Sequence, residues 1–173
     1  MLINLTEYFE VKGKQAEIEL PYEDSEFDSG ITVFPVESKE NCRLTIRNVG
    51  DGKLELKGNG NFVLSSVCDR CLKPVTFEVP ISFEYTVNKP DGYHEDNEDT
   101  ESFVDGYELD AKALINNELI MSLPMKVLCK DTCKGLCPVC GKDRNEGECG
   151  CDTFVPDPRL AAIKDIFNAN KEV

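Results

Sequence analysis

Residues 75–87 read Val-Thr-Phe-Glu-Val-Pro-Ile-Ser-Phe-Glu-Tyr-Thr-Val, and an apolar side chain occupies every odd-numbered position. A period of two residues is typical of a β-strand with one buried and one solvent-facing side. Pro80 has no backbone N–H to give to a neighbouring strand, so we expect this strand at a sheet edge or bulged at Pro80. The stretch therefore predicts one long strand with a single apolar face.

Shorter segments that precede this strand also have strand-like patterns. They are residues 16–20, 42–48, 54–57 and 61–67. Gly50-Asp51-Gly52 and Gly58-Asn59-Gly60 separate three of them and predict two tight turns, because these residue types tolerate positive φ. Together the segments predict an antiparallel meander of four or more strands.

A helix is predicted after Asp110, whose side chain suits the position that caps a helix N-terminus. Pro124 ends this helix, because the residue before a proline is driven away from the α region. The apolar residues cover more than one stripe, so we expect the helix to be well buried against the odd-numbered face of the long strand. A short second helix is predicted to begin at Asp157-Pro158, since proline suits the first helical position.

Residues 91–110 form a strongly acidic stretch that contains no Lys or Arg. The simplest interpretation is a solvated connection, and the sharper one is an acidic arm for a basic partner such as a ribosomal protein. We expect an antiparallel β-rich half over residues 1–90, an acidic linker over 91–109, and the helix, cysteine-rich segment and short C-terminal helix over 110–173. We expect all three segments to belong to one integrated α+β domain.

The chain has 173 residues and a formal net charge of -14. A field of this sign repels phosphate backbones, so direct and extensive nucleic-acid binding is disfavoured unless the basic residues gather in one patch. The residues in question are Arg43, Arg47, Arg70, Lys73, Lys126, Lys130, Lys134, Lys142 and Arg144. The sequence shows neither a secretory signal nor an apolar run of the ~20 residues that a membrane helix needs, so a cytoplasmic protein is expected.

Eight of the nine cysteines lie in short-spaced groups, which in a reducing compartment indicates metal binding and not disulfides. Two residues separate Cys137 from Cys140, so both sulfurs can point at one ion, as in zinc ribbons. The later pair, Cys149 and Cys151, completes a four-thiolate set, with Gly150 permitting the tight turn. These four cysteines make up one predicted metal site.

A second site is predicted from two further pairs, Cys68 with Cys71 and Cys129 with Cys133. The first pair falls between two predicted strands, at a hairpin tip. One site made from both pairs is the simplest assembly, and an exchange of Cys133 with a member of the other set is left open. Cys42 shares a strand face with apolar residues and is expected to be a buried core thiol.

Four thiolates for each ion make a closed site, whereas catalytic zinc keeps a position for water. The sequence also has no nucleophile elbow and only one histidine, so we expect no enzymatic activity. Thiolate ligands suit iron as well as zinc. A redox protein is therefore the rival hypothesis, either a rubredoxin-like iron carrier or a dithiol switch that uses Cys68 and Cys71.

The chain resembles the YceD family, the large ribosomal RNA subunit accumulation proteins, formerly a domain of unknown function. The matching features are the motif at residues 68–71, the acidic stretch, the helix that ends near Leu123-Pro124, and the C-terminal motifs. The C-terminal motifs are residues 135–141, Asn145, the pair Cys149 and Cys151, and Asp157-Pro158-Arg159-Leu160-Ala161.

This resemblance implies a bacterial or plastid protein that large-subunit ribosomal RNA needs for its accumulation, through processing or ribosome assembly. It implies no catalytic residues. Taken with the cysteine pattern, it favours a non-enzymatic factor with two structural zinc sites, iron being the less favoured metal. The partner expected is a ribosomal protein, an assembly factor or a pre-ribosomal particle.

Overall fold

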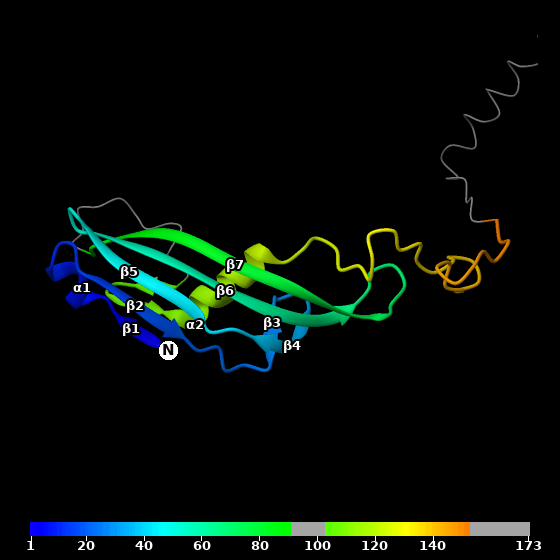
Figure 1. Cartoon of the computed structure of the whole chain (residues 1–173), viewed down its shortest axis with the longest axis horizontal. Coiled ribbons are helices and arrows are strands. Elements are labelled where there is room, and N and C mark those ends of the chain that lie inside the picture. The colour runs from blue at the N-terminus through cyan, green and yellow to red at the C-terminus, as the bar shows by residue number, and fades with distance from the viewer. Residues whose placement is uncertain (91–102, 153–173) are drawn as a thin grey trace, which may run out of the picture.

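The computed structural model describes residues 1–90 and 103–152. Its elements in chain order are β1 (Leu2–Asn4), α1 (Thr6–Glu10), β2 (Gln15–Leu20), β3 (Glu26–Asp28), β4 (Val33–Lys39), β5 (Cys42–Gly50), β6 (Lys53–Val67), β7 (Pro74–Asn88), β8 (Val104–Asp105), β9 (Glu108–Asp110) and α2 (Ala111–Ser122). Figure 1 shows an elongated molecule, with the cysteine-rich segment at the end where the β6–β7 hairpin turns.

The predicted long strand is β7, and it pairs with β6 without interruption from Lys53 opposite Asn88 to Val67 opposite Pro74. Its odd-numbered side chains are buried or half-buried, and its even-numbered ones are mostly exposed. Among the described residues, β7 pairs with β6 alone. It is therefore an edge strand, the first of the two positions expected from Pro80.

The main sheet is antiparallel throughout, in the order β2-β5-β6-β4-β3, with β7 on the other side of β6. Strands β5, β6 and β7 form a meander of three strands and not the predicted four or more, because the predicted strands 54–57 and 61–67 are both part of β6. The turn at Gly50-Asp51-Gly52 joins β5 to β6, and both Asp51 (φ 54°) and Gly52 (φ 69°) take the positive φ that this turn requires.

The second predicted turn, at Gly58-Asn59-Gly60, is wrong, because β6 runs straight through it. These glycines serve close packing instead. A Cβ on Gly58 would lie 2.3 Å from the Phe83 ring and 2.7 Å from the Arg43 carbonyl oxygen, and one on Gly60 would lie 3.3 Å from Cys42 Cα. Glycine inside a strand often marks such a close approach.

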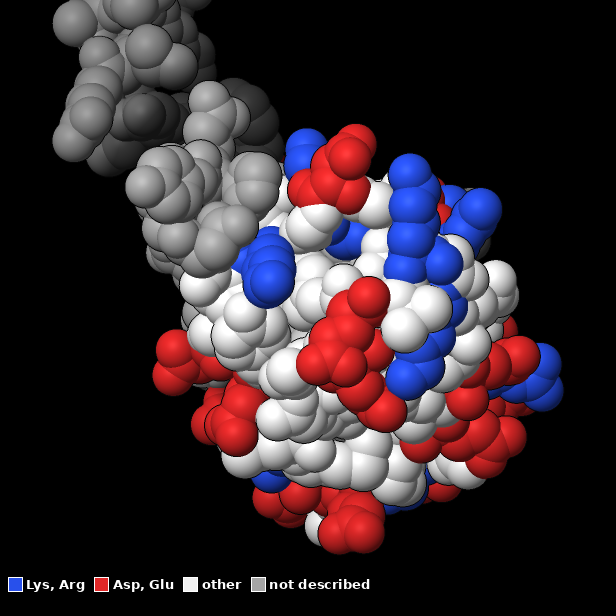
Figure 2. Space-filling model, turned by 90° about the vertical axis from the view of Figure 1, so that its left-hand side faces the viewer, with Lys and Arg blue, Asp and Glu red and all other residues white. Residues whose placement is uncertain are grey.

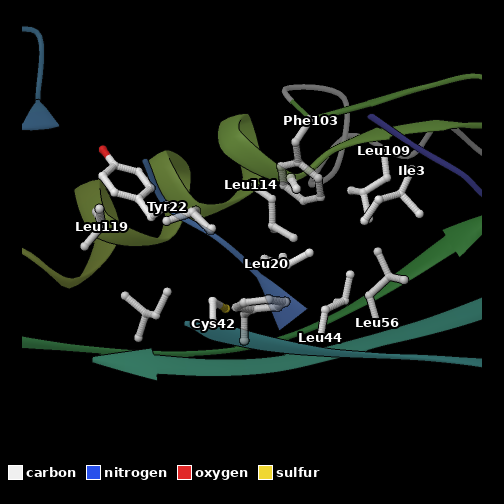
Figure 3. Close-up of a cluster of buried hydrophobic side chains, with 14 of the residues drawn as sticks. Ile3, Leu20, Tyr22, Cys42, Leu44, Leu56, Phe103, Leu109, Leu114 and Leu119 are labelled. Carbon is white, nitrogen blue, oxygen red and sulfur yellow. The ribbon is translucent and has the colours of Figure 1, made fainter. Parts of the chain in front are cut away.

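Helix α2 covers the apolar face of the sheet (Figure 1). In Figure 3, Leu114 and Leu119 of the helix point toward the strands that carry Cys42, Leu44 and Leu56. All five side chains are fully buried. Cys42 is thus the predicted core thiol, and burial together with the charge of Glu118 raises its pKa to about 11.

The Asp110 side chain caps α2 as predicted, accepting hydrogen bonds from the backbone N–H groups of Lys112 at 2.9 Å and Ala113 at 3.3 Å. The helix packs on β7, and its Glu118 accepts a 2.6 Å hydrogen bond from the Tyr85 hydroxyl. Burial is one-sided, however, since Met121 is 76% exposed. The helix that was predicted to be well buried is therefore buried on one face only.

A small second sheet, in the order β1-β9-β8, contributes Ile3 and Leu109 to the hydrophobic core. Its strands β8 and β9 occupy the end of the segment expected to be an acidic linker, where Phe103 and Leu109 are buried. The rest of that segment and the helix predicted at Asp157-Pro158 lie outside the described residues. Within the described parts of the chain, no helix is both long and apolar enough to span a membrane.

The architecture confirms the predicted α+β class: an antiparallel sheet packed on a helix, followed by a cysteine-rich segment. The division into segments at 1–90, 91–109 and 110–173 stays a prediction.

Replacing Gly58 by Ala should destabilise the fold by about 1–3 kcal/mol, the usual cost of overpacking a core. The clash includes the rigid Arg43 carbonyl, so side-chain movement alone does not relieve it. Urea unfolding measures the effect. Asn59→Ala, on the exposed side of the same strand, is the control and should change the free energy of unfolding by less than about 0.5 kcal/mol. Equal stability of the two variants would contradict the packing role of Gly58.

Candidate metal centres

The loop between β6 and β7 forms a tight turn around Cys68 and Cys71, which we call the first knuckle (residues 68–73). Its Cys68 N–H donates to the Lys73 carbonyl and its Leu72 N–H donates to the Cys68 carbonyl, both at 2.8 Å. Leu72 closes the turn with a φ of 60°, in the left-handed region. Cys68 has no exposed surface and Cys71 is also buried.

Residues 137–142 form a second knuckle with the same hydrogen bonds. The Cys137 N–H donates to the Lys142 carbonyl at 2.8 Å, and the Gly141 N–H donates to the Cys137 carbonyl at 2.9 Å. Gly141, with a φ of 73°, takes the position that Leu72 holds in the first knuckle. The cluster motifs thus share one backbone conformation, which glycine adopts without strain and leucine adopts at a cost.

The chain after α2 delivers Cys129 and Cys133 to the first knuckle. Asp69 anchors it twice: its N–H donates to the Val127 carbonyl at 2.9 Å, and its carboxylate accepts from the Val127 N–H at 2.7 Å. The Arg70 guanidinium then donates to the Cys133 carbonyl at 2.7 Å. These side chains join segments that are far apart in the sequence.

In the first cluster, the sulfurs of Cys68, Cys71, Cys129 and Cys133 all lie within 4.8 Å of one another. Cys68 and Cys133 sulfurs are 3.8 Å apart, and Cys71 and Cys129 sulfurs are 3.6 Å apart. Zinc–sulfur bonds of ~2.3 Å in a tetrahedron place sulfurs about 3.8 Å apart. The four thiols are free, and the spacing fits a metal ion and not a disulfide, whose sulfurs lie ~2.05 Å apart.

The second cluster brings together the sulfurs of Cys137, Cys140, Cys149 and Cys151, also within 4.8 Å of one another. Gly150 takes a positive φ of 69° between the last two cysteines, as the short spacing required. This cluster is more open, because Cys140 is exposed and Cys149 and Cys151 are half-buried. An all-sulfur donor set of four suits zinc or iron.

Backbone N–H groups lower the pKa of one cysteine in each knuckle to about 6. At Cys137, the N–H groups of Cys140 and Val139 are the main cause. At Cys68, burial raises the pKa, but N–H groups of several residues, first that of Cys129, outweigh it. Hydrogen bonds to the thiolate favour the charged form, which is the form that binds metal.

Other cysteines of the clusters shift in the opposite direction. Burial and then hydrogen bonding with Cys71 raise the pKa of Cys129 to about 12. Hydrogen bonding with Cys140 and Cys149 raises the pKa of Cys151 to about 12. Thiolates that lie close together repel one another, so deprotonation of several neighbouring thiols is unfavourable. A metal cation bound among them would offset this repulsion.

The structure places the eight cysteines in the two predicted groups, and Cys133 lies with the first group and not the second. That they are metal ligands stays a prediction. The anchoring roles of Asp69 and Arg70 and the contact of Asn145 with the Cys133 sulfur were not predicted from the sequence. Position in a motif was the available signal, since Asp69 and Arg70 lie inside the Cys68–Cys71 motif and Asn145 is among the matching residues.

The chain is similar to a known protein family. The model described as "Large ribosomal RNA subunit accumulation protein YceD" matches residues 56–167. The matched region spans more than half of the chain and includes all eight clustered cysteines. No curated protein and no solved structure matches the chain.

Purified protein should contain two zinc ions per chain, measured by elemental analysis. Cys68→Ser and Cys140→Ser should each hold one, because each variant breaks one four-sulfur set. The control is Cys42→Ser, outside both clusters, which should keep two. Visible absorbance with about one iron per chain would instead favour the rubredoxin-like alternative.

Leu72→Gly should stabilise the metal-loaded protein by up to about 1 kcal/mol, because glycine adopts positive φ without the leucine penalty. Val139→Gly is the matched control, since Val139 is equally exposed and lies in the second knuckle without a positive φ. It should destabilise the protein by about 0.5–1 kcal/mol. Urea unfolding at saturating zinc compares them, and a loss of stability in Leu72→Gly would contradict strain at this turn.

Proposed function

We propose a function for this chain on the ground that it belongs to the family of the large ribosomal RNA subunit accumulation protein YceD. It acts without catalysis in the accumulation of large-subunit ribosomal RNA, through RNA processing or ribosome assembly in the bacterial cytoplasm. Two structural zinc ions hold its cysteine-rich segment in shape. The family match, which takes in both cysteine clusters, carries this proposal.

Closed ligation supports a structural role for the metal. Each cluster offers four sulfurs, which fill a tetrahedral ion and leave no position for substrate or water. Among the described residues around the clusters, Val127 is buried, whereas Val75, Leu128 and Leu136 are only partly buried against the first cluster. Small segments of this kind depend on metal for their fold.

A dithiol switch at Cys68 and Cys71 has less support. Redox-active cysteines sit in partly exposed positions, where partners can reach the sulfur. Cys68 has no exposed surface, and each of the two sulfurs has its near neighbour in the chain after α2. Burial inside a four-sulfur cluster favours metal binding over thiol exchange.

The distribution of charge favours a protein partner over extended contact with RNA. Arg43 and Arg47 lie on β5, apart from the basic residues around the clusters. Arg70 and Lys73 already have partners within the chain. Arg70 donates a hydrogen bond to the Cys133 carbonyl, and Lys73 forms an ion pair with Asp143 at 2.8 Å. Figure 2 shows the end of the molecule opposite the clusters, where basic and acidic side chains are interspersed and neither sign covers the face.

Exposed apolar side chains at the knuckles fit the same partner class. Leu72 is 61% exposed, Val139 is 60% exposed, and Met125 between α2 and the first cluster is fully exposed. Large apolar side chains that are exposed in this part of the chain are candidate contacts for another protein. The partner proposed is a ribosomal protein or assembly factor on a pre-ribosomal particle.

Depleting the protein in its host should lower the amount of large-subunit ribosomal RNA. It should also lower the peak of free large subunits in sucrose-gradient profiles. Wild type and Cys42→Ser should restore both, whereas Cys140→Ser should not, because one structural site is lost. A double variant, Leu72→Ser with Val139→Ser, should keep two zinc ions but lose co-sedimentation with large-subunit precursors. A normal amount of large-subunit ribosomal RNA after depletion would refute the proposed function. Full co-sedimentation of the double variant would refute contact with the partner through Leu72 and Val139.

A further inference from the structure

One polar side chain, that of Asn145, joins the two cysteine clusters. Its Nδ2 donates a hydrogen bond to the Cys133 sulfur of the first cluster at 3.4 Å. In the chain, however, Asn145 lies between Cys140 and Cys149 of the second cluster. A side chain carried by one candidate metal site therefore contacts a sulfur of the other.

Hydrogen bonds hold the Asn145 amide in this orientation. Its Oδ1 accepts from the Lys134 N–H at 2.9 Å. Asp143 Oδ1 accepts both from the Asn145 backbone N–H at 2.8 Å and from Nδ2 at 2.7 Å. Two amide hydrogens thus have two acceptors, one of them the sulfur, so the N–H that faces Cys133 is preorganised.

The second knuckle determines where Asn145 lies. Leu136 and Asp143 form an antiparallel bridge, and the Arg144 N–H donates to the Gly135 carbonyl at 2.9 Å. The chain that leaves the second knuckle therefore returns beside residues 133–136, and it carries Asn145 back to Cys133. A metal ion in the second cluster would hold this hairpin closed, because its ligands lie at the hairpin tip and beyond.

We propose that Asn145 couples the two metal sites, so that metal in the second site raises the affinity of the first. This inference rests on the metal binding proposed above. An N–H donated to a ligand fixes the orientation of that ligand, and losing such an outer contact typically costs about 10–100-fold in metal affinity. Coupling of two binding sites is reciprocal, so metal in the first site favours the second by the same factor.

The test is a double-mutant cycle on the full chain, stripped of metal under reducing conditions and loaded with cadmium, which favours sulfur ligands as zinc does. Cadmium NMR should give one resonance for each site, and the resonance lost in Cys140→Ser identifies the second site. A competing chelator then measures first-site affinity in wild type, Asn145→Ala, Cys140→Ser and the double variant.

Asn145→Ala should weaken the first site about tenfold and shift its cadmium resonance, although Asn145 is not a ligand. In the Cys140→Ser background, the same substitution should have little effect, because the open hairpin has already withdrawn the donor. Such non-additivity measures the coupling. Thr132→Ala, an exposed neighbour of Cys133, is the control and should leave both affinities unchanged.

Equal effects of Asn145→Ala in both backgrounds, or no effect in either, would overturn the coupling. If Asn145→Ala fails to fold, Asn145→Asp replaces it, because aspartate retains the shape and the Oδ acceptor and has a carboxylate oxygen in place of the donor. Asn145→Asp should weaken the first site when Cys140 is intact and should have little effect in the Cys140→Ser background. Two bound cadmium ions with additive effects would overturn the coupling but leave metal binding intact. A wild type that binds no cadmium would overturn both.

Discussion

The uninterrupted pairing of β6 with β7 is the constraint on which the rest of the molecule depends. A slip of one residue would turn Val79 and Ile81 from the core to solvent, so the buried face of β7 holds the register. Cys68 follows the last paired residue of β6, Val67, directly. The hydrophobic core therefore also fixes where the first knuckle begins, although the two lie at different places along the hairpin.

The two cysteine clusters differ in their burial and in how they are attached to the sheet. In the first, Cys68, Cys71 and Cys133 are buried and Cys129 is exposed. Val75, Leu128 and Leu136 pack against the buried cysteines, and the β6–β7 hairpin attaches the cluster to the sheet. The second is more open and is attached to the first, for example through the Leu136 N–H, which donates to the Arg70 carbonyl at 2.9 Å. Structure thus propagates outward from the sheet to the first cluster and from there to the second.

Patterns that one physical rule governs were predictable from sequence. Alternation located β7, the capping rule located the start of α2 at Asp110, and spacing located the knuckle cysteines. The Gly58-Asn59-Gly60 error arose because glycine serves turns and close strand packing alike. The two uses are distinguished by tertiary contacts, here the positions of the Phe83 ring and the Arg43 carbonyl.

The contacts around the clusters were not predictable in the same way. Arg70 reaches a carbonyl more than sixty residues away, and Asp69 pairs with Val127 across a similar gap. Such hydrogen bonds leave no local periodicity. The grouping of the two cysteine pairs was predictable from the coordination number of the metal. Neither Cys68 with Cys71 nor Cys129 with Cys133 supplies the four ligands of a tetrahedral site alone.

Pro80, at the middle of β7, has a consequence for the behaviour of the protein at high concentration. An edge strand of this length offers a row of main-chain donors and acceptors on which a second molecule could form an intermolecular sheet. Proline removes one donor from that row, and the exposed Glu78 and Glu84 on either side add repulsion between like charges. Pro80, which indicates an edge strand in the sequence, thus also helps to keep the chain from fibrillar self-association.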